Sequence, residues 1–247
     1  MNGSSLFTII DPKSYVSEAY RLMRINIMFS RTDKRVKTIV VTGANLAEGK
    51  STVAANYAIT LAHADSKVLV IDCDLRKPTI HKKFGLANRI GLTNILAQNL
   101  SPRKNMQVSV HVPNLYFITS GPIPPNPSEL IGSDKMKNLI SDLYEEYDYI
   151  IMDTPPVGVV TDAALLSSGI DGVVLVLESG RAEIEAAQRA KALLNNVKAN
   201  ILGVVINKIE AKNSGYYKYY YKEENEASAL KKKVRYINEK SKVINYD

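Results

Sequence analysis

The chain has 247 residues, of which 45% are hydrophobic and 23% charged, the balance of a soluble globular protein with one sizeable core. A single cysteine, Cys73, excludes a disulfide framework and a multi-cysteine metal centre, and it favours a reducing, cytosolic compartment. We find neither a run of ~18 apolar residues nor a signal-peptide pattern, so we expect no membrane-spanning helix.

Apolar runs and helical spacings then alternate along the chain. Residues 14–29 have helical spacing, with Leu22, Ile25 and Phe29 on one face. Strands are predicted at 38–41, 67–71, 149–152, 172–177 and 201–206, and further helices at 50–63, 134–146 and 182–195. The less regular section 86–127 is expected to form loops and short helices over the sheet edge. This order predicts an α/β fold, a mostly parallel sheet with helices on both faces.

The C-terminal part differs in composition from the rest. We divide the chain into a domain over residues 1–210, with an N-terminal oligomerisation helix, and a flexible tail over 211–247. From Tyr216 onward, eight Lys/Arg against five Asp/Glu leave a charge of +3, within a total of +7. Such a tail could touch acidic lipid or nucleic acid, or it could be a solvated extension.

A glycine-containing loop follows the first predicted strand and precedes a helix, which is the order of a phosphate-binding loop. In such a loop, backbone N–H groups and the helix N-terminus attract phosphate oxygens. Lys50 would reach the β- and γ-phosphates, and the Ser51 hydroxyl would bind Mg²⁺. The residues predicted to bind the nucleotide here are Gly43, Ala44, Asn45, Ala47, Glu48, Gly49, Lys50, Ser51 and Thr52. The first glycine of the standard pattern is displaced, with Ala44 in its place and Gly43 one position early. These features predict a P-loop NTPase.

Carboxylates follow two of the predicted strands. Asp72 and Asp74 come after the run at 67–71, and Asp153 comes after the run at 149–152. Ligands of open α/β sheets bind at the carboxyl ends of the strands. Each aspartate alone could cap a helix or a turn. Three of them after a phosphate-binding loop predict, together with Ser51, a site for nucleotide-bound Mg²⁺.

With these motifs in place, nearly the whole chain resembles the bacterial tyrosine kinases of the capsule and exopolysaccharide type, the BY-kinases. Residues 41–52 resemble their Walker A motif, 72–78 their Walker A′ motif and 153–156 their Walker B motif. Residues 121–130 match a proline-rich segment typical of these proteins. One departure is Leu46-Ala47, where family members commonly carry Pro-Gly.

The resemblance implies an ATP-dependent protein-tyrosine kinase that uses Mg²⁺. Lys50, Asp72 and Asp74 would be catalytic, with Asp72 as the base, and Asp74 and Asp153 would support the metal ion. Asn207 resembles an adenine-contacting position, although an asparagine at a strand end is often a turn residue. The implied phosphate acceptors form a C-terminal cluster of Tyr216, Tyr217, Tyr219, Tyr220 and Tyr221.

Assembly and partners are also implied by the resemblance. Glu18, Arg21 and Arg24 match a motif of ring assembly, whereas their spacing alone favours a local Glu18–Arg21 pair on a solvated helix face. The ring would place each tail in a neighbour's site. We further expect a membrane-anchored activator of the polysaccharide co-polymerase type, a cognate tyrosine phosphatase and no nucleic acid. The chain would be cytoplasmic and held at the inner face of the membrane by its activator.

Three other functions compete with the kinase. A switch ATPase of the septum-positioning or partition type would share the fold but would carry a lysine in place of Asn45. A cluster-carrier ATPase would need paired cysteines. A nucleotide-gated scaffold would use the tyrosine tail only for binding. Delivery of phosphate to water, to tyrosine or to neither distinguishes the kinase from the switch and the scaffold.

Overall fold

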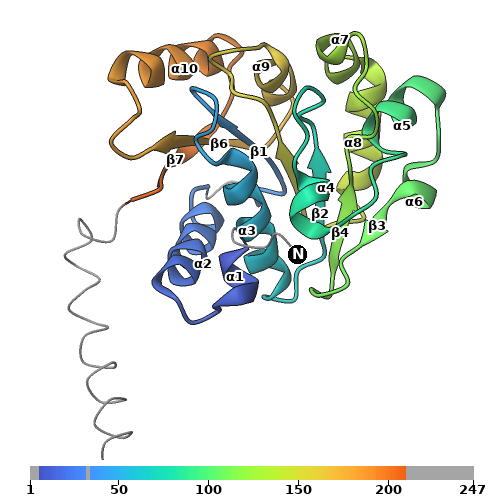
Figure 1. Cartoon of the computed structure of the whole chain (residues 1–247). Coiled ribbons are helices and arrows are strands. Elements are labelled where there is room, and N and C mark those ends of the chain that lie inside the picture. The colour runs from blue at the N-terminus through green and yellow to red at the C-terminus, as the bar shows by residue number, and fades with distance from the viewer. Residues whose placement is uncertain (1–5, 32–33, 210–247) are drawn as a thin grey trace, which may run out of the picture. The chain divides into compact units, whose positions relative to one another are not determined.

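The computed structural model describes residues 6–31 and 34–209, which form a seven-stranded sheet (Figure 1). The strand order is β3-β4-β2-β5-β1-β6-β7, and every neighbouring pair is parallel except β3 with β4. The strands are β1 (Thr38–Gly43), β2 (Val68–Asp72), β3 (Gln107–Val108), β4 (Leu115–Ile118), β5 (Tyr149–Asp153), β6 (Gly172–Glu178) and β7 (Ile201–Asn207). The tyrosine cluster and the rest of the predicted tail lie outside the described residues, so the domain boundary at residue 210 stays a prediction.

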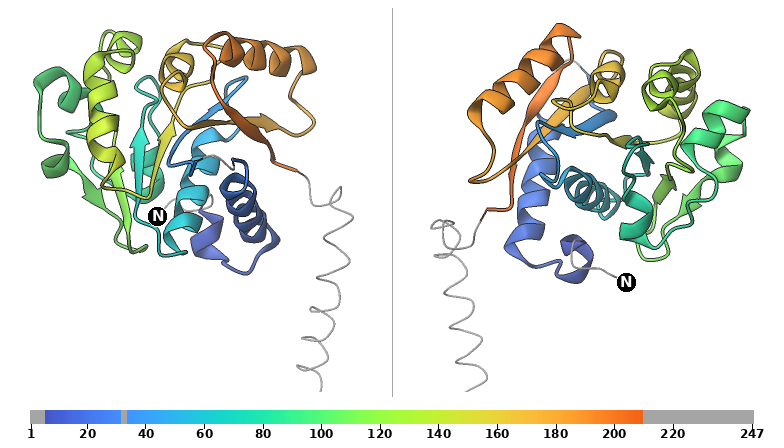
Figure 2. Two further views of the ribbon diagram at one scale, coloured as in Figure 1. Left: turned by 180° about the vertical axis from the view of Figure 1, so that it is seen from behind. Right: turned by 45° about the horizontal axis from the view of Figure 1, so that its top comes forward.

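Helices cover both faces of this sheet, as two further views show (Figure 2). One face carries α1 (Phe7–Ile10), α2 (Tyr15–Met28), α3 (Lys50–Ala62) and α4 (Ile80–Phe84). The opposite face carries α5 (Leu92–Gln98), α7 (Pro127–Ile131), α8 (Asp134–Tyr144), α9 (Asp162–Ser167) and α10 (Ile184–Asn196), and α6 (Pro102–Asn105) lies in the connection before β3. The α/β class and the two-sided helical cover predicted from the sequence are confirmed.

The apolar runs become strands because their side chains are needed on both faces of the sheet. Every residue of β1, β2 and β5 is buried, as parallel strands between two helical layers require. Local signals set the helix starts. The Ser14 hydroxyl accepts a hydrogen bond from the Ser17 amide at the start of α2, and Ser133 does the same for α8.

One expectation was wrong. The section 86–127 contains a core strand, β4, which pairs in parallel with β2 and is largely buried. Its apolar run is flanked by Pro, Asn, Ser and Gly residues, which are typical of loops and conceal a short strand. The sequence did not say which face of α2 is buried: Leu22 and Ile25 of this helix, and Phe29 just after it, are exposed. Tyr20 and Ile27, on another face of the helix, pack on the sheet side instead.

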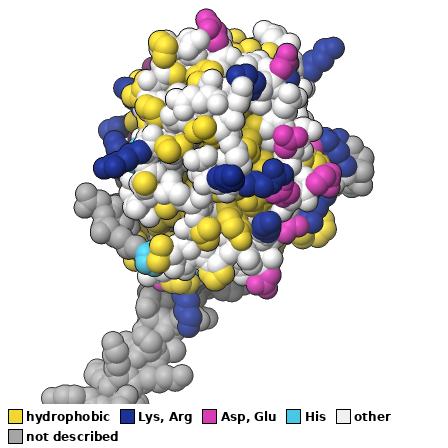
Figure 3. Space-filling view, turned by 90° about the vertical axis from the view of Figure 1, so that its right-hand side faces the viewer, with side chains coloured by type: hydrophobic (Ala, Val, Ile, Leu, Met, Phe, Trp, Pro, Cys, Tyr) yellow, Lys and Arg dark blue, Asp and Glu magenta, His cyan; other side chains and the backbone are white. Residues whose placement is uncertain are grey.

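Among the described residues, no helix combines the length and the apolar character that a membrane crossing requires. The face beside α5, α6 and α8 shows basic and acidic side chains intermixed (Figure 3). Two ion pairs belong to this part of the chain, Arg103 with Glu146 and Lys137 with Asp134. That face therefore lacks the purely basic surface that would attract nucleic acids.

Candidate active site

Strand pairing brings the predicted site residues to one edge of the sheet. Asp72 at the end of β2 is paired with Asp153 at the end of β5, and Asp153 is paired in turn with Val41 of β1. Two residues after Val41, the phosphate-binding loop begins at Gly43. The loop and both acids therefore share the carboxyl edge, as the sequence predicts.

The phosphate-binding loop connects β1 to α3 and contains two residues in the left-handed region. Gly49 has a φ of 88°, and a Cβ there would lie 2.1 Å from the Asn207 Nδ2 atom, so only glycine fits. Ala47 has a φ of 62°. This is the position at which related kinases commonly carry glycine, and alanine holds the conformation at a cost of about 1 kcal/mol.

Three side chains brace this loop. The Glu48 carboxylate accepts a hydrogen bond from the backbone N–H of Asn45 at 2.9 Å. The side-chain amide of Asn207 donates to the backbone carbonyl of Glu48, also at 2.9 Å. Lys208 donates to the Ala47 carbonyl at 2.7 Å and to a Glu178 carboxylate oxygen at 2.8 Å. Burial raises the pKa of Glu48, and the hydrogen bond from Asn45 opposes this. Asn207 thus contacts the loop backbone, and its predicted contact with adenine stays a prediction.

The segment after Asp153 is fastened to the start of the same loop. Thr42 donates through its hydroxyl to the Pro155 carbonyl at 2.9 Å, and the Val157 amide donates to the Gly43 carbonyl at 2.9 Å. A Cβ added to Gly158 would lie 2.3 Å from the Ala44 carbonyl oxygen. The Walker B strand end and the loop therefore form one rigid unit.

The two paired acids are buried and short of partners. Within the described residues, three carboxylate oxygens have no hydrogen bond: both oxygens of Asp153 and the Oδ1 atom of Asp72. Asp72 Oδ2 accepts one from the Ile80 amide at 3.1 Å. Burial raises the pKa of Asp153 to about 7, and the nearby Ser51 hydroxyl opposes this rise without making a hydrogen bond of ordinary geometry. Burial, with the nearby Asp153 charge, raises the pKa of Asp72 well above its usual range.

These orphaned oxygens fit a hydrated Mg²⁺, which prefers oxygen ligands and keeps several waters. The described residues contain no group of three or more acidic, His or Cys side chains that would hold a metal by themselves. The metal ion would therefore need oxygens from the nucleotide as well. Asp72, Asp74, Asp153 and the Ser51 hydroxyl are the groups that could hold it there.

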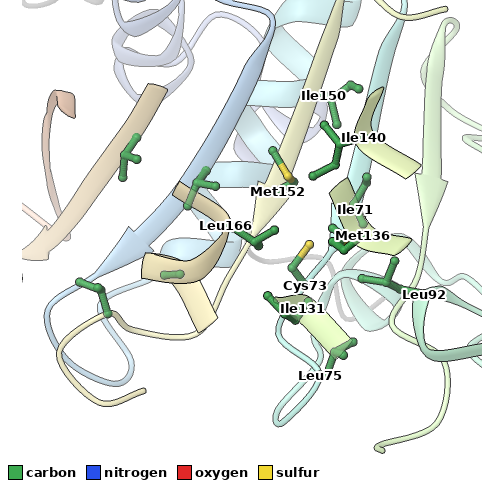
Figure 4. Close-up of a cluster of buried hydrophobic side chains, with 14 of the residues drawn as sticks. Ile71, Cys73, Leu75, Leu92, Ile131, Met136, Ile140, Ile150, Met152 and Leu166 are labelled. Atoms are coloured by element: carbon green, nitrogen blue, oxygen red, sulfur yellow. The ribbon is translucent and has the colours of Figure 1, made fainter. Parts of the chain in front are cut away.

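Lys50 and Asp74 complete the predicted set. The Lys50 side chain is buried, and burial lowers its pKa while Asp153 and Asp74 raise it. Asp74 accepts the backbone N–H groups of Arg76 and Lys77 at 3.2 and 2.9 Å, which holds the turn after β2. Cys73 stands between Asp72 and Asp74 in the sequence, and its side chain lies in the apolar cluster beneath α5 and α7 to α10 (Figure 4). This cysteine therefore belongs to the core.

One buried acid near the site was not predicted from the sequence. Arg76 of the Walker A′ segment donates to both carboxylate oxygens of Asp162, at 3.0 and 3.2 Å, and to Ser128 at 2.8 Å. Asp162 is fully buried at the start of α9. Ser128 belongs to the proline-rich segment, which is thereby attached to the Walker A′ turn. No local pattern marks Asp162, because its partner is 86 residues away in the sequence.

The predicted assembly motif lies on α2, on the surface of the molecule. Arg21 forms an ion pair with Glu18 at 2.5 Å, and both side chains are largely exposed. The local pair that the spacing favours is therefore present. The role of Glu18, Arg21 and Arg24 in a ring stays a prediction.

A phosphate-binding loop, two strand-end acid motifs and a parallel sheet of this order define a P-loop NTPase. The family model described as ParA, an NUBPL iron-transfer P-loop NTPase, matches residues 35–239, and the chain belongs to that family. The single cysteine, buried in the core, does not provide the paired thiolates of a cluster carrier.

Within this class, known relatives define the chain more narrowly. It is 43% identical over 221 residues to the tyrosine-protein kinase YwqD of Bacillus subtilis, covering 90% of this chain and 93% of the relative. It is 41% identical over 218 residues to the putative tyrosine-protein kinase CapB of Staphylococcus aureus, covering 88% and 95%. The chain belongs to the bacterial tyrosine-protein kinases, and protein-tyrosine kinase is the enzyme class that this membership gives.

Solved structures agree with this membership. The chimerical protein CapA2B2 has a TM-score of 0.80 and 42% identity, over 83% of this chain and 90% of that one. The kinase domain of the Escherichia coli tyrosine kinase ETK has a TM-score of 0.80 and 31% identity, over 85% and 82%. The cell division ATPase MinD of Pyrococcus furiosus, at 22% identity and a TM-score of 0.61, shows the shared fold alone.

Proposed function

We propose that this chain transfers the γ-phosphoryl group of ATP to tyrosines of its own C-terminal cluster, residues 216–221. The observation that carries the proposal is the convergence of Lys50, Asp72 and Asp153 at one buried sheet edge. A buried lysine beside carboxylate oxygens that have no hydrogen bond suits a charged, metal-bound nucleotide, because the metal ion would supply the partner that these oxygens lack.

Each residue has a distinct role in this proposal. The loop amides and Lys50 would bind the β- and γ-phosphates, and the Ser51 hydroxyl, Asp74 and Asp153 would hold Mg²⁺, largely through water. Bound Mg²⁺ would supply neutralisation of charge on the transferring phosphoryl group. Positioning and electrostatic stabilisation contribute most of the rate enhancement in such transfers.

The transfer needs a base, because a tyrosine hydroxyl with a pKa near ~10 is protonated at neutral pH. Asp72 accepts this proton as the phenolic oxygen forms its bond to the γ-phosphorus. The bond from the γ-phosphorus to the β,γ-bridging oxygen breaks, and ADP leaves with that electron pair. The raised pKa of Asp72 makes it a stronger proton acceptor than an ordinary aspartate.

The setting of the reaction is part of the same proposal. We infer a homo-oligomeric ring in which a tail enters a neighbour's site, an activator anchored in the membrane, and control of capsular or extracellular polysaccharide synthesis. The exposed apolar residues Leu22, Ile25 and Phe29 on α2, beside Glu18 and Arg21, support an interface there. Each phosphate adds about −1.5 to −2 charges, so several would reverse the tail's positive charge and release it.

The test is where the phosphate goes. The purified chain is incubated with ATP and Mg²⁺, alone and with the cytosolic segment of a co-polymerase partner, and phosphate is measured both in solution and on the protein. Wild type should gain phosphotyrosine. Lys50→Met should gain none, and Lys82→Met, a charge change on an exposed side chain, should match wild type.

The same measurement separates the competing functions. Release of phosphate to water with no phosphotyrosine would support a switch ATPase. Neither product, with nucleotide bound, would support a nucleotide-gated scaffold. Either result under all partner conditions would overturn the kinase proposal.

A further inference from the structure

A second lysine reaches the nucleotide site from outside the phosphate-binding loop. Lys83 lies on the short helix α4, which follows the Walker A′ motif. The helix is fixed beside Asp72, because the Ile80 amide donates to Asp72 Oδ2 at 3.1 Å and the Ile80 side chain is fully buried. From there, Lys83 Nζ donates to the Thr52 hydroxyl at 2.9 Å, at the start of α3.

The surroundings of this ammonium group are those of a site residue. Lys83 is half-buried, and burial lowers its pKa while the Asp153 charge raises it. The same charge acts in reverse, since Lys83 and Lys50 both oppose the rise in the pKa of Asp153. Two lysines from separate elements therefore act on the one buried acid. The neighbouring Lys82 is exposed to solvent.

We propose that Lys83 is a second cationic positioning residue of the nucleotide site, which orients the Thr52 hydroxyl and offsets negative charge there. The proposal rests on nucleotide binding at the loop. Three strand-end aspartates and the nucleotide phosphates would place a large negative charge against Lys50 alone. An additional ammonium in a partly buried setting attracts phosphate more strongly than a solvated surface lysine does.

This role predicts a dependence on Mg²⁺ and on salt that a purely structural lysine would not show. When Mg²⁺ is absent, Lys83 offsets more of the charge, so its removal costs more affinity. Its contribution also shrinks as salt screens the site. The Lys83→Met variant keeps an unbranched apolar side chain at this half-buried position and removes the charge and the donor.

The experiment measures the Kd of ADP by isothermal titration, with EDTA or with Mg²⁺, at low and at high salt. We expect Lys83→Met to weaken binding roughly tenfold in EDTA and low salt, and by about two- to threefold with Mg²⁺. Lys82→Met should stay within about twofold of wild type under all conditions. Lys83→Arg, which keeps the charge, should recover part of the loss.

Thermal unfolding of the ligand-free variants completes the test. An affinity loss in Lys83→Met that is the same in every buffer, with a lowered Tm, would show a structural role and overturn the proposal. Equal ADP affinity of Lys83→Met and Lys82→Met would also overturn it. If wild type itself fails to bind ADP, the proposed function fails as well, whereas a deficit confined to Lys83→Met leaves both standing.

Discussion

The phosphate-binding loop and the acid pair lie side by side at one sheet edge, yet the protein treats them in opposite ways. The loop is braced by Glu48, Asn207 and Lys208, whose hydrogen bonds hold its backbone. Asp72 and Asp153 are buried with carboxylate oxygens that have no hydrogen bond among the described residues. A preformed loop meets a phosphate without rearrangement, whereas orphaned acids are satisfied only by what binds.

The two parts of the site affect the stability of the ligand-free fold in opposite directions. Bracing adds stability to the ligand-free fold, and the bare acids subtract from it because a buried carboxylate without partners keeps its desolvation penalty. Changes to the acids should therefore trade stability against activity. Changes to the brace should lower both.

The largest effect is expected from Asp153→Asn. Removing the charge should lower the rate of phosphotransfer by about 100-fold or more, because Asp153 would no longer help to hold the Mg²⁺ that neutralises charge on the reacting phosphoryl group. The ligand-free variant should nevertheless unfold at a higher temperature than wild type, since an orphaned buried carboxylate has gone. Steady-state kinetics measures the rate and calorimetry measures the unfolding temperature. Lost activity together with a lower Tm would contradict the expected exchange of activity for stability.

The pH dependence of stability sharpens the same contrast. The pKa of Asp153 is raised to about 7 in the folded chain, so the folded state holds more protons than the unfolded state between about pH 4 and 7. The free energy of unfolding should therefore fall as pH rises through this window, by about 1–4 kcal/mol. Urea unfolding at several pH values should show a flatter slope for Asp153→Asn. A wild-type slope of the opposite sign would count against an orphaned acid.

A matched pair of substitutions tests the loop. Gly49→Ala forces a Cβ against Asn207 at a positive φ and should lower the free energy of unfolding by about 1–3 kcal/mol. Ala47→Gly relieves the left-handed alanine and should raise it by up to about 1 kcal/mol. Denaturant unfolding measures both. Shifts of the same sign would mean that the loop conformation differs from the one described.

The smallest effect concerns the brace from β7. Lys208→Ala removes the hydrogen bond to Ala47 and the ion pair with Glu178. Because the lysine is largely exposed, we expect a loss below about 1 kcal/mol in unfolding free energy. ADP affinity should weaken by about two- to threefold. Lys198→Ala, another exposed lysine, is the control, and equal behaviour of the two would remove Lys208 from the brace.

The sequence predicted the elements that have strong local signals. The five predicted strands and the Lys50 helix were found because their apolar patterns are continuous and alternate regularly along the chain, and the aspartates were found because they follow such strands. The strand β4 was missed, since its four residues gain their partners only from β2. Periodicity identified α2 but did not tell which face is buried, because packing against α3 decides that face.

Site residues that act over long sequence separations were beyond prediction for the same reason. Asp162 meets Arg76 across 86 residues, and Lys208 meets Ala47 across 161. Lys83 belongs to no recognisable motif, and it reaches Thr52 only because α4 begins beside Asp72. Local motifs therefore predicted a set of nucleotide-site residues, and the fold shows what holds those residues in place.

The most direct test of the account combines two full-length variants, neither of which is expected to phosphorylate its own cluster. A chain with an intact site and phenylalanine at all five cluster tyrosines is mixed with Lys50→Met, which has an intact cluster, in ATP, Mg²⁺ and the co-polymerase segment. Peptide mass spectrometry then locates the phosphate. We predict phosphotyrosine within residues 216–221 of the Lys50→Met chain and none when either chain is incubated alone. An unmodified cluster in the mixture, while wild type labels itself under the same conditions, would contradict transfer from one chain's site to another chain's tail.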